Sequence, residues 1–218
     1  MKILITSDLH GNFPNVDNCD LFLICGDICP TTNHNRNFQE KWINSQLFPW
    51  LKSLSAKKII FIAGNHDFWF ESKGKKLLSS INKEDKIIYL RNSFYEYKGI
   101  KIFGTPYCKQ FGNWAFMRKS QILEEKYSMI PDDLDILLTH DAPMLNDVGS
   151  ILDRPTQCNV GNPILAKHIL IKKPKYVFCG HIHSGNHELQ NVNGTQIANV
   201  SLVNEEYQPV NKILEINI

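Results

Sequence analysis

The sequence predicts a layered domain of the α/β or α+β class, in which short apolar strands alternate with amphipathic helices. Apolar runs with the length of buried strands, such as Ile3–Thr6 and Leu21–Cys25, recur along the chain. Longer segments between some of them carry apolar residues at helical spacing. Lys98-Gly99 and Asn193-Gly194 indicate tight turns between neighbouring strands. Strands separated by helices, with some hairpins, are typical of sheets covered by helices.

In the first half of the chain, strands and helices follow from these patterns in order. The strands are expected at 3–6, 21–25, 57–62, 87–90, 93–97 and 100–103. A helix is expected over 38–54, because its apolar residues recur at helical spacing, and another over 71–82. Pro49 should kink or break the first helix, because proline lacks the backbone N–H and its ring meets the preceding turn.

The second half of the chain continues the pattern. Residues 104–116 are expected to form a loop rich in aromatic side chains, and 142–160 should be mostly loop. Helices are expected near 117–127 and over 162–172. The remaining strands are expected at 135–138, 176–179, 196–203 and 212–218. We find no internal repeat or linker and therefore expect one domain over residues 1–218.

Composition excludes several classes of protein. The 218 residues are 43% hydrophobic, enough for a sizeable core. With 24 basic and 22 acidic residues the net charge is +2, so binding to nucleic acid through phosphates is not expected. The six cysteines show no CxxC spacing, so no disulfide framework or structural zinc site is indicated. No signal peptide or stretch of about 18 apolar residues is present, and we expect a cytoplasmic protein without a membrane partner. Nothing in the sequence indicates an oligomeric state.

Polar clusters directly follow five of the predicted strands. They are Asp8-Leu9-His10, Gly26-Asp27, Gly64-Asn65-His66-Asp67, Thr139-His140-Asp141 and Gly180-His181-Ile182-His183. Polar side chains at the end of a buried strand are costly unless something gathers them. In an open α/β sheet, ligands bind beyond the carboxyl ends of the strands. We therefore expect the five clusters to converge on one pocket.

The clusters supply ligands for divalent cations. Asp8 and His10 are two residues apart, as are His181 and His183, so each pair should point the same way from extended chain. Mixed nitrogen and oxygen ligands suit Mn, Fe, Zn, Co or Ni. The candidate ligands are too many for one tetrahedral ion and suit two: Asp8, His10, Asp27, Asn65, His140, His181 and His183. Two metal ions about 3.5–4 Å apart can promote displacement at phosphorus.

With these residues the chain resembles the calcineurin-like metallophosphoesterases. Their pattern is D-x-H, G-D, G-N-H-[DE], a His after a strand, and G-H-x-H, and this chain has SDLH, GD, GNHD, LLTHDAP and GHIH in that order over residues 8–183. The resemblance implies two mixed β-sheets packed as a sandwich flanked by helices. It implies one metal ion held by Asp8, His10, Asp27 and His183. It implies a second ion held by Asp27, Asn65, His140 and His181.

The resemblance also implies a reaction. A metal-bound hydroxide would attack phosphorus, and His66 would protonate the leaving oxygen or stabilise the phosphate charge. Part of the chain is similar to a narrower subgroup, the metallophosphoesterase-domain-containing proteins, through GTPYCKQFGNWAF, THDAP and YQPVN. This similarity favours a phosphodiesterase, with cyclic nucleotides as one candidate class of substrate.

One departure from a related branch narrows the function. After Gly26-Asp27 the chain reads Ile28-Cys29-Pro30, where Ser/Thr protein phosphatases have G-D-x-x-D-R-G. The missing Asp-Arg argues against a protein phosphatase and leaves His66 without an identified orienting partner. Asp67 is not assigned that role, because neighbours in an extended segment point apart.

The expected function is hydrolysis of a small phosphorylated substrate with two divalent cations, Mn first, with Fe, Zn, Co, Ni or Mg as other candidates. The alternatives are a nuclease of the same superfamily and a non-catalytic scaffold with this fold. Three further histidines are expected to take no part in the site: His34, His168 and His187. The aromatic residues of the 104–116 loop are expected to pack that loop, with a substrate wall as the alternative: Tyr107, Phe111, Trp114 and Phe116.

Overall fold

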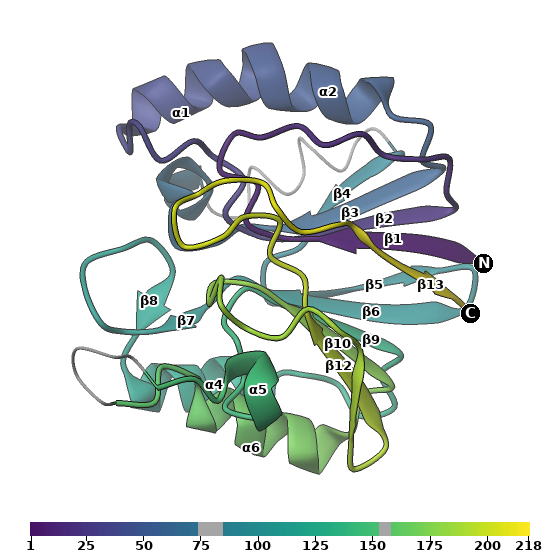
Figure 1. Ribbon diagram of the computed structural model, residues 1–218, viewed down its shortest axis with the longest axis vertical. Coiled ribbons are helices and arrows are strands. Elements are labelled where there is room, and N and C mark those ends of the chain that lie inside the picture. The colour runs from purple at the N-terminus through teal and green to yellow at the C-terminus, as the bar shows by residue number, and fades with distance from the viewer. Residues whose placement is uncertain (74–84, 153–157) are drawn as a thin grey trace.

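The computed structural model describes residues 1–73, 85–152 and 158–218. Two mixed β-sheets lie face to face, with α1 and α2 over the first sheet and α4, α5 and α6 over the second (Figure 1). The predicted layered α/β class is confirmed, and so is the helix-flanked sandwich that the resemblance implied.

The first sheet has the strand order β13-β1-β2-β3-β4. Its strands are β1 (Lys2–Thr6), β2 (Leu21–Cys25), β3 (Lys58–Ile62), β4 (Ile87–Tyr89) and β13 (Leu214–Asn217). Strands β1 to β4 run parallel, and β13 pairs antiparallel with β1. Every residue of β2 and β3 is buried, which explains why these strands are continuous apolar runs rather than alternating ones.

The second sheet has the order β11-β12-β10-β9-β6-β5. Its strands are β5 (Ser93–Tyr97), β6 (Ile100–Thr105), β9 (Ile136–Thr139), β10 (Tyr176–Cys179), β11 (Gln190–Val192) and β12 (Thr195–Asn199). Strands β6, β9, β10 and β12 run parallel. Both predicted turns are confirmed, because Lys98, Gly99, Asn193 and Gly194 all have positive φ, as a type I′ hairpin turn requires.

Several predicted segments differ in extent from the structure. The strand expected at 196–203 ends at Asn199, and only isolated bridges at Ser201 and Val203 follow. The loop at 104–116 contains β7 (Cys108–Lys109), which pairs with β8 (Met117–Arg118). The segment at 142–160 contains one helical turn, α5 (Asn146–Gly149). Strands of two residues and a helix of one turn are too short to leave a hydrophobic periodicity in the sequence.

The helices follow the predicted segments. They are α1 (Arg36–Trp42), α2 (Phe48–Ser53), α4 (Ser120–Ser128) and α6 (Pro163–Lys172). The disturbance expected at Pro49 is present as a π-helical segment, Ile43–Leu47, just before it. A wider turn accommodates a residue that cannot donate a backbone hydrogen bond. The helix predicted over 71–82 lies mostly outside the described residues; residues 68–73 are helical.

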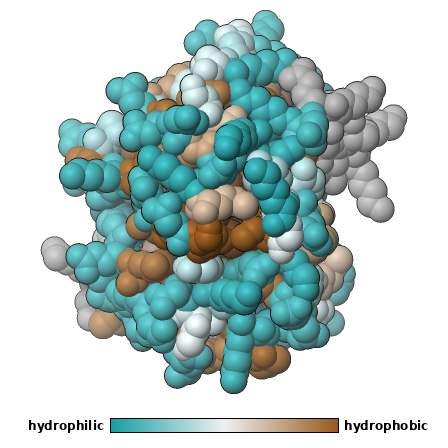
Figure 2. Space-filling model, turned by 90° about the vertical axis from the view of Figure 1, so that its right-hand side faces the viewer, coloured by the Kyte–Doolittle hydropathy of each residue, from teal (hydrophilic) through white to brown (hydrophobic). Residues whose placement is uncertain are grey.

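The core between the sheets is built from alternate residues of facing strands. Ile3, Ile5 and Leu23 of the first sheet share one buried cluster with Ile136 and Phe178 of the second. Figure 2 views the side of the molecule where the parallel strands begin, and hydrophobic residues gather near the middle of this face. Among the described residues, no helix is long and apolar enough to cross a membrane. The polar clusters lie in the loops at the opposite, carboxyl ends of the parallel strands.

Candidate metal centre

The loops after five strands from the two sheets meet at one place. Asp8 and His10 follow β1, Asp27 follows β2, Asn65 and His66 follow β3, His140 follows β9, and His181 and His183 follow β10. Hydrogen bonds join these loops directly, because the His140 ring donates from Nδ1 to the Cys25 carbonyl at 2.9 Å and the Gly180 N–H donates to the His140 carbonyl at 3.1 Å. The five polar clusters therefore share one site.

The site contains two groups of side chains that could each hold a cation. The Asp8 group consists of Asp8, His10 and His183, and the Asp27 group consists of Asp27, His140 and His181. Within each group the candidate ligand atoms all lie within 4.8 Å of one another. Asp27 Oδ2 lies 3.3 Å from His140 Nε2 and 3.8 Å from His10 Nε2, so this carboxylate stands between the two groups.

The donor and acceptor pattern fits a bound cation in both groups. In His140 the Nδ1–H donates to a carbonyl, so the lone pair of Nε2 faces Asn65 Oδ1 at 2.9 Å and Asp27 Oδ2 at 3.3 Å. In His183 the Nδ1–H donates to the Asn204 carbonyl at 2.9 Å, and Nε2 faces Asp8 Oδ1 at 3.4 Å. Acceptors that face one another in a buried site need positive charge between them.

The electrostatics of the site favour ionised carboxylates. Burial works against ionisation of Asp8 and Asp27, yet the neighbouring histidines, His183 and His140 foremost, hold the pKa of both carboxyls below their usual range. Burial lowers the pKa of His10 to about 4, which leaves its ring neutral. For His140, burial is outweighed by the Asp27 carboxylate, which raises its pKa to about 10. A cation at this place would replace the proton that His140 otherwise holds.

Four predicted ligands have left-handed backbone conformations. The φ angles are 53° at Asp8, 45° at His10, 48° at Asp27 and 69° at His181. A non-glycine residue in a sparsely populated region costs about 1–3 kcal/mol, so such residues gather where function requires them. The expected extended backbone is therefore wrong, although Asp8 and His10 do point to the same ligand group. His181 and His183 belong to different groups.

Glycines allow the loops to approach the ligands closely. A Cβ on Gly64 would overlap Asp27 Oδ1 and the Asp27 backbone N, and a Cβ on Gly180 would overlap Asp8 Oδ2. Asp67 holds the same loops together, because its buried carboxylate accepts hydrogen bonds from Gly64 N at 2.7 Å and Cys29 N at 2.9 Å. Asp67 thus fixes the backbone and does not orient His66.

His66 faces the cavity beside the Asp27 group. Its Nε2 lies 3.9 Å from Asp27 Oδ2, and its Nδ1 lies 2.9 Å from His34 Nε2. The expectation that His34 takes no part is therefore wrong, because His34 fixes the ring of His66. His168 of α6 pairs with Glu124 of α4. His187 bonds to Asn199 and Asn211. Neither histidine belongs to the two ligand groups.

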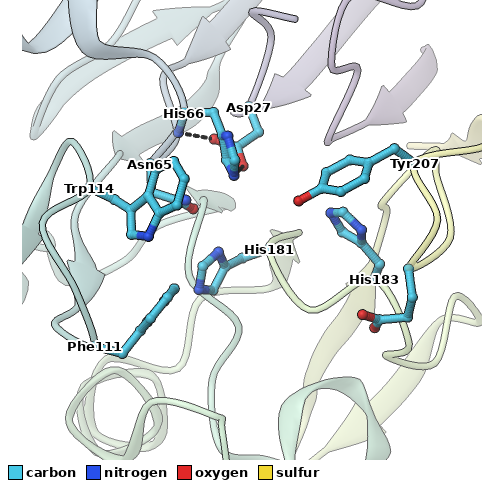
Figure 3. Close-up of a pocket in the computed structure, with 9 residues that line it drawn as sticks. Asp27, Asn65, His66, Phe111, Trp114, His181, His183 and Tyr207 are labelled. Carbon is cyan, nitrogen blue, oxygen red and sulfur yellow. Dashed lines mark hydrogen bonds and ion pairs between the residues drawn. The ribbon is translucent and has the colours of Figure 1, made fainter. Parts of the chain in front are cut away.

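A cavity of about 200 Å³ opens over the site. Its lining consists of Asp27, Asn65, His66, Phe111, Trp114, His181, His183, Glu205 and Tyr207. Figure 3 shows Trp114 and Phe111 on one side and Tyr207 with His183 on the other, with His66 and His181 between them. Trp114 and Phe111 therefore form a wall, whereas Tyr107 and Phe116 are buried in the loop as expected. Tyr207 was not predicted as a site residue.

The fold and the two ligand groups resemble those of the calcineurin-like phosphoesterase family, whose members use divalent metals. A family model described as calcineurin-like phosphoesterase matches residues 1–185, and the chain belongs to this family. The resemblance inferred from the five sequence blocks is thereby confirmed.

Curated relatives are similar to this chain in sequence, and solved structures are similar to it in fold. Metallophosphoesterase domain-containing protein 1 of Homo sapiens is 28% identical over 195 residues, covering 78% of this chain and 57% of the relative. A UPF0046 protein of Caenorhabditis elegans is 30% identical, covering 76% of this chain and 46% of the relative. The chain thus spans about half the length of these relatives. The crystal structure of phosphopantetheinyl hydrolase from Mycobacterium tuberculosis shares the fold, with a TM-score of 0.58 at 13% identity over 94% of this chain and 90% of that one.

Proposed function

We propose that this protein is a phosphodiesterase that hydrolyses a small phosphate ester with two divalent cations, cyclic nucleotides being one candidate class. The observation that carries the proposal is the pair of ligand groups that meet at Asp27 on the floor of a cavity. A general acid candidate, His66, faces the same cavity. Together these are the parts needed for hydrolysis at phosphorus.

The two cations would have separate ligands and share one carboxylate. One ion would be held by Asp8, His10, Asp27 and His183. The other would be held by Asp27, Asn65, His140 and His181. The mixture of carboxylate, imidazole and amide ligands suits Mn, which we propose first, ahead of Fe, Zn, Co, Ni and Mg. Such cations, when bound, neutralise phosphate charge and activate water.

The protein side chains would position the ester and move one proton. His66 would donate a proton from Nε2 to the leaving oxygen. His34 would hold His66 in place, since its Nε2 lies 2.9 Å from His66 Nδ1. Trp114 and Phe111 offer flat apolar surface against which the organic part of the ester would rest.

The charges of the cavity favour a diester over a monoester. Its lining includes the carboxylates of Asp27 and Glu205 and, among the residues that the structure describes, no Lys or Arg. A monoester carries a second negative charge near neutral pH, which the bound cations would have to balance alone, because this lining adds no Lys or Arg side chain among the residues that the structure describes. A singly charged diester fits the site better.

A substrate panel tests the proposed function. The protein would be stripped of metal, loaded with Mn, Ni, Co, Zn or Mg, and assayed with mono-, di- and cyclic phosphate esters. We expect Mn-dependent hydrolysis in which a diester or cyclic phosphate has the highest kcat/KM. Salt-sensitive cleavage of oligonucleotides would instead favour a nuclease. Failure to hydrolyse any ester with any metal would favour a scaffold.

A further inference from the structure

Tyr207 lies at the cavity on a segment that the ligand motifs do not include. Its backbone has φ 59°, in the left-handed region, which is uncommon for an aromatic residue and unfavourable. The residue lines the cavity and is 43% exposed. A strained residue that keeps an aromatic side chain in an open cavity indicates a function beyond packing.

Asn204 builds the turn that carries Tyr207. The Asn204 Oδ1 accepts hydrogen bonds from Glu206 N at 3.1 Å and from Gln208 N at 2.9 Å. The Asn204 carbonyl accepts from Tyr207 N at 2.9 Å and also from His183 Nδ1 at 2.9 Å. The turn is therefore fixed to a candidate metal ligand, and the position of Tyr207 is set relative to the Asp8 group.

The ring of Tyr207 packs on that group and its hydroxyl remains available. The ring centroid lies 4.9 Å from that of His10 and 5.4 Å from that of His183, both edge to face. Figure 3 shows the hydroxyl directed into the cavity, toward the space between His183 and His66. A phenol hydroxyl carries its proton at neutral pH, so it can donate a hydrogen bond.

We propose that the Tyr207 hydroxyl donates a hydrogen bond to a non-bridging oxygen of the substrate's phosphate group. This inference rests on the proposed function and adds a residue that touches the substrate. The cavity lining, as far as the structure describes it, offers no Lys or Arg for this contact. A fixed neutral donor stabilises the charge that develops on phosphate oxygens without requiring a second negative charge on the substrate.

Two substitutions separate the hydroxyl from the ring. Tyr207→Phe removes only the hydroxyl, and we expect kcat for the preferred ester to fall about 100-fold while elemental analysis still finds the wild-type metal content. Tyr207→Ala also removes the packing on His10 and His183, and we expect it to lose metal as well. The matched control is Tyr176→Phe, at the start of β10 and away from the cavity, which should keep wild-type activity.

Binding of inorganic phosphate to the Mn-loaded protein gives a readout that does not depend on turnover. By calorimetry, Tyr207→Phe should weaken phosphate binding about tenfold, which corresponds to one hydrogen bond to a charged group. If the wild type hydrolyses no ester, the proposed function fails and this affinity alone decides the role of Tyr207. Wild-type kcat in Tyr207→Phe overturns the inference, as does wild-type phosphate affinity in an inert protein. Loss of metal from Tyr207→Phe also overturns it, by making the hydroxyl a metal ligand.

Discussion

At the scale of single residues, the site depends on contacts between side chains far apart in the sequence. The clearest is the hydrogen bond between His34 and His66, which are 32 residues apart. His66 would need one fixed orientation to protonate a leaving oxygen, and His34 supplies it by bonding through its Nε2 to His66 Nδ1. The ring of Trp114 packs on both histidines, with centroids 5.1 Å from His34 and 4.6 Å from His66.

Substitution of His34 should slow the hydrolysis of esters with poor leaving groups most. His34→Gln would leave the His66 ring without its partner, so kcat for an alkyl diester should fall about tenfold. A nitrophenyl diester, whose leaving group needs little protonation, should lose less than about twofold. Steady-state kinetics on the two esters would show the difference.

The matched control for this prediction is His168→Gln, because His168 lies on the outer helix α6 and bonds to Glu124. His168→Gln should hydrolyse both esters at wild-type rates. An equal loss for both esters in His34→Gln would contradict an orienting role for His34.

Inference from the sequence identifies site residues that belong to a spaced motif and misses site residues that belong to none. Asp8 and His183 belong to spaced motifs at strand ends, so they could be predicted. His34 stands in the segment Thr31-Thr32-Asn33-His34, where nothing marks its partner. Tyr207 could be noticed only within YQPVN, and its left-handed backbone cannot be read from the residue type. Contacts between loops depend on the three-dimensional path of the chain.

At the scale of elements, parallel strands explain why the loops meet. Strands β1, β2 and β3 are buried, mostly apolar runs followed within three residues by polar site residues, and this contrast made their ends predictable. The π-helical segment before Pro49 could be predicted only as a disturbance. Its type depends on how the helix packs against the sheet, which local sequence does not determine.

Gly64 tests whether loop geometry positions the ligands. Gly64→Ala would place a Cβ against Asp27 Oδ1 and the Asp27 backbone N, so one of the loops must shift. We expect the variant to fold but to bind Mn at least about tenfold more weakly, as for loss of a residue supporting a metal ligand. Titration with Mn followed by calorimetry would measure this change.

The control is Gly99→Ala, in the hairpin between β5 and β6. This glycine has φ 82° and nothing within 4 Å of an added Cβ, so only backbone strain is introduced. It should cost about 1 kcal/mol of stability and leave Mn affinity unchanged. Wild-type Mn affinity in Gly64→Ala would show that the close approach of the two loops is not needed.

At the scale of the whole molecule, the candidate metal centre joins the two sheets. Each ligand group takes residues from both of them: Asp8 and Asp27 follow strands of the first sheet, whereas His183 and His140 follow strands of the second. Bound cations would therefore hold the sandwich together at the carboxyl ends of its strands. Ions that bind only the folded state stabilise it by mass action.

Removal of metal should lower thermal stability. One site with free ion at about 100 times Kd contributes about 2.7 kcal/mol, and each kcal/mol shifts Tm by about 2–4 °C for a chain of this size. A chelator should thus lower Tm by about 5–10 °C per site, and added Mn should restore it in calorimetric scans. An unchanged Tm would mean that the ions do not link the sheets.

The metal content of Asp27→Asn tests the central claim, that separate loops hold two cations around one shared carboxylate. Asparagine keeps an oxygen that can accept from His66 N, as Asp27 Oδ1 does at 2.7 Å, so the loop should keep its shape. Elemental analysis after Mn loading and dialysis should find two ions per wild-type chain and a loss from both sites in the variant. Full retention of two ions by Asp27→Asn would contradict the account.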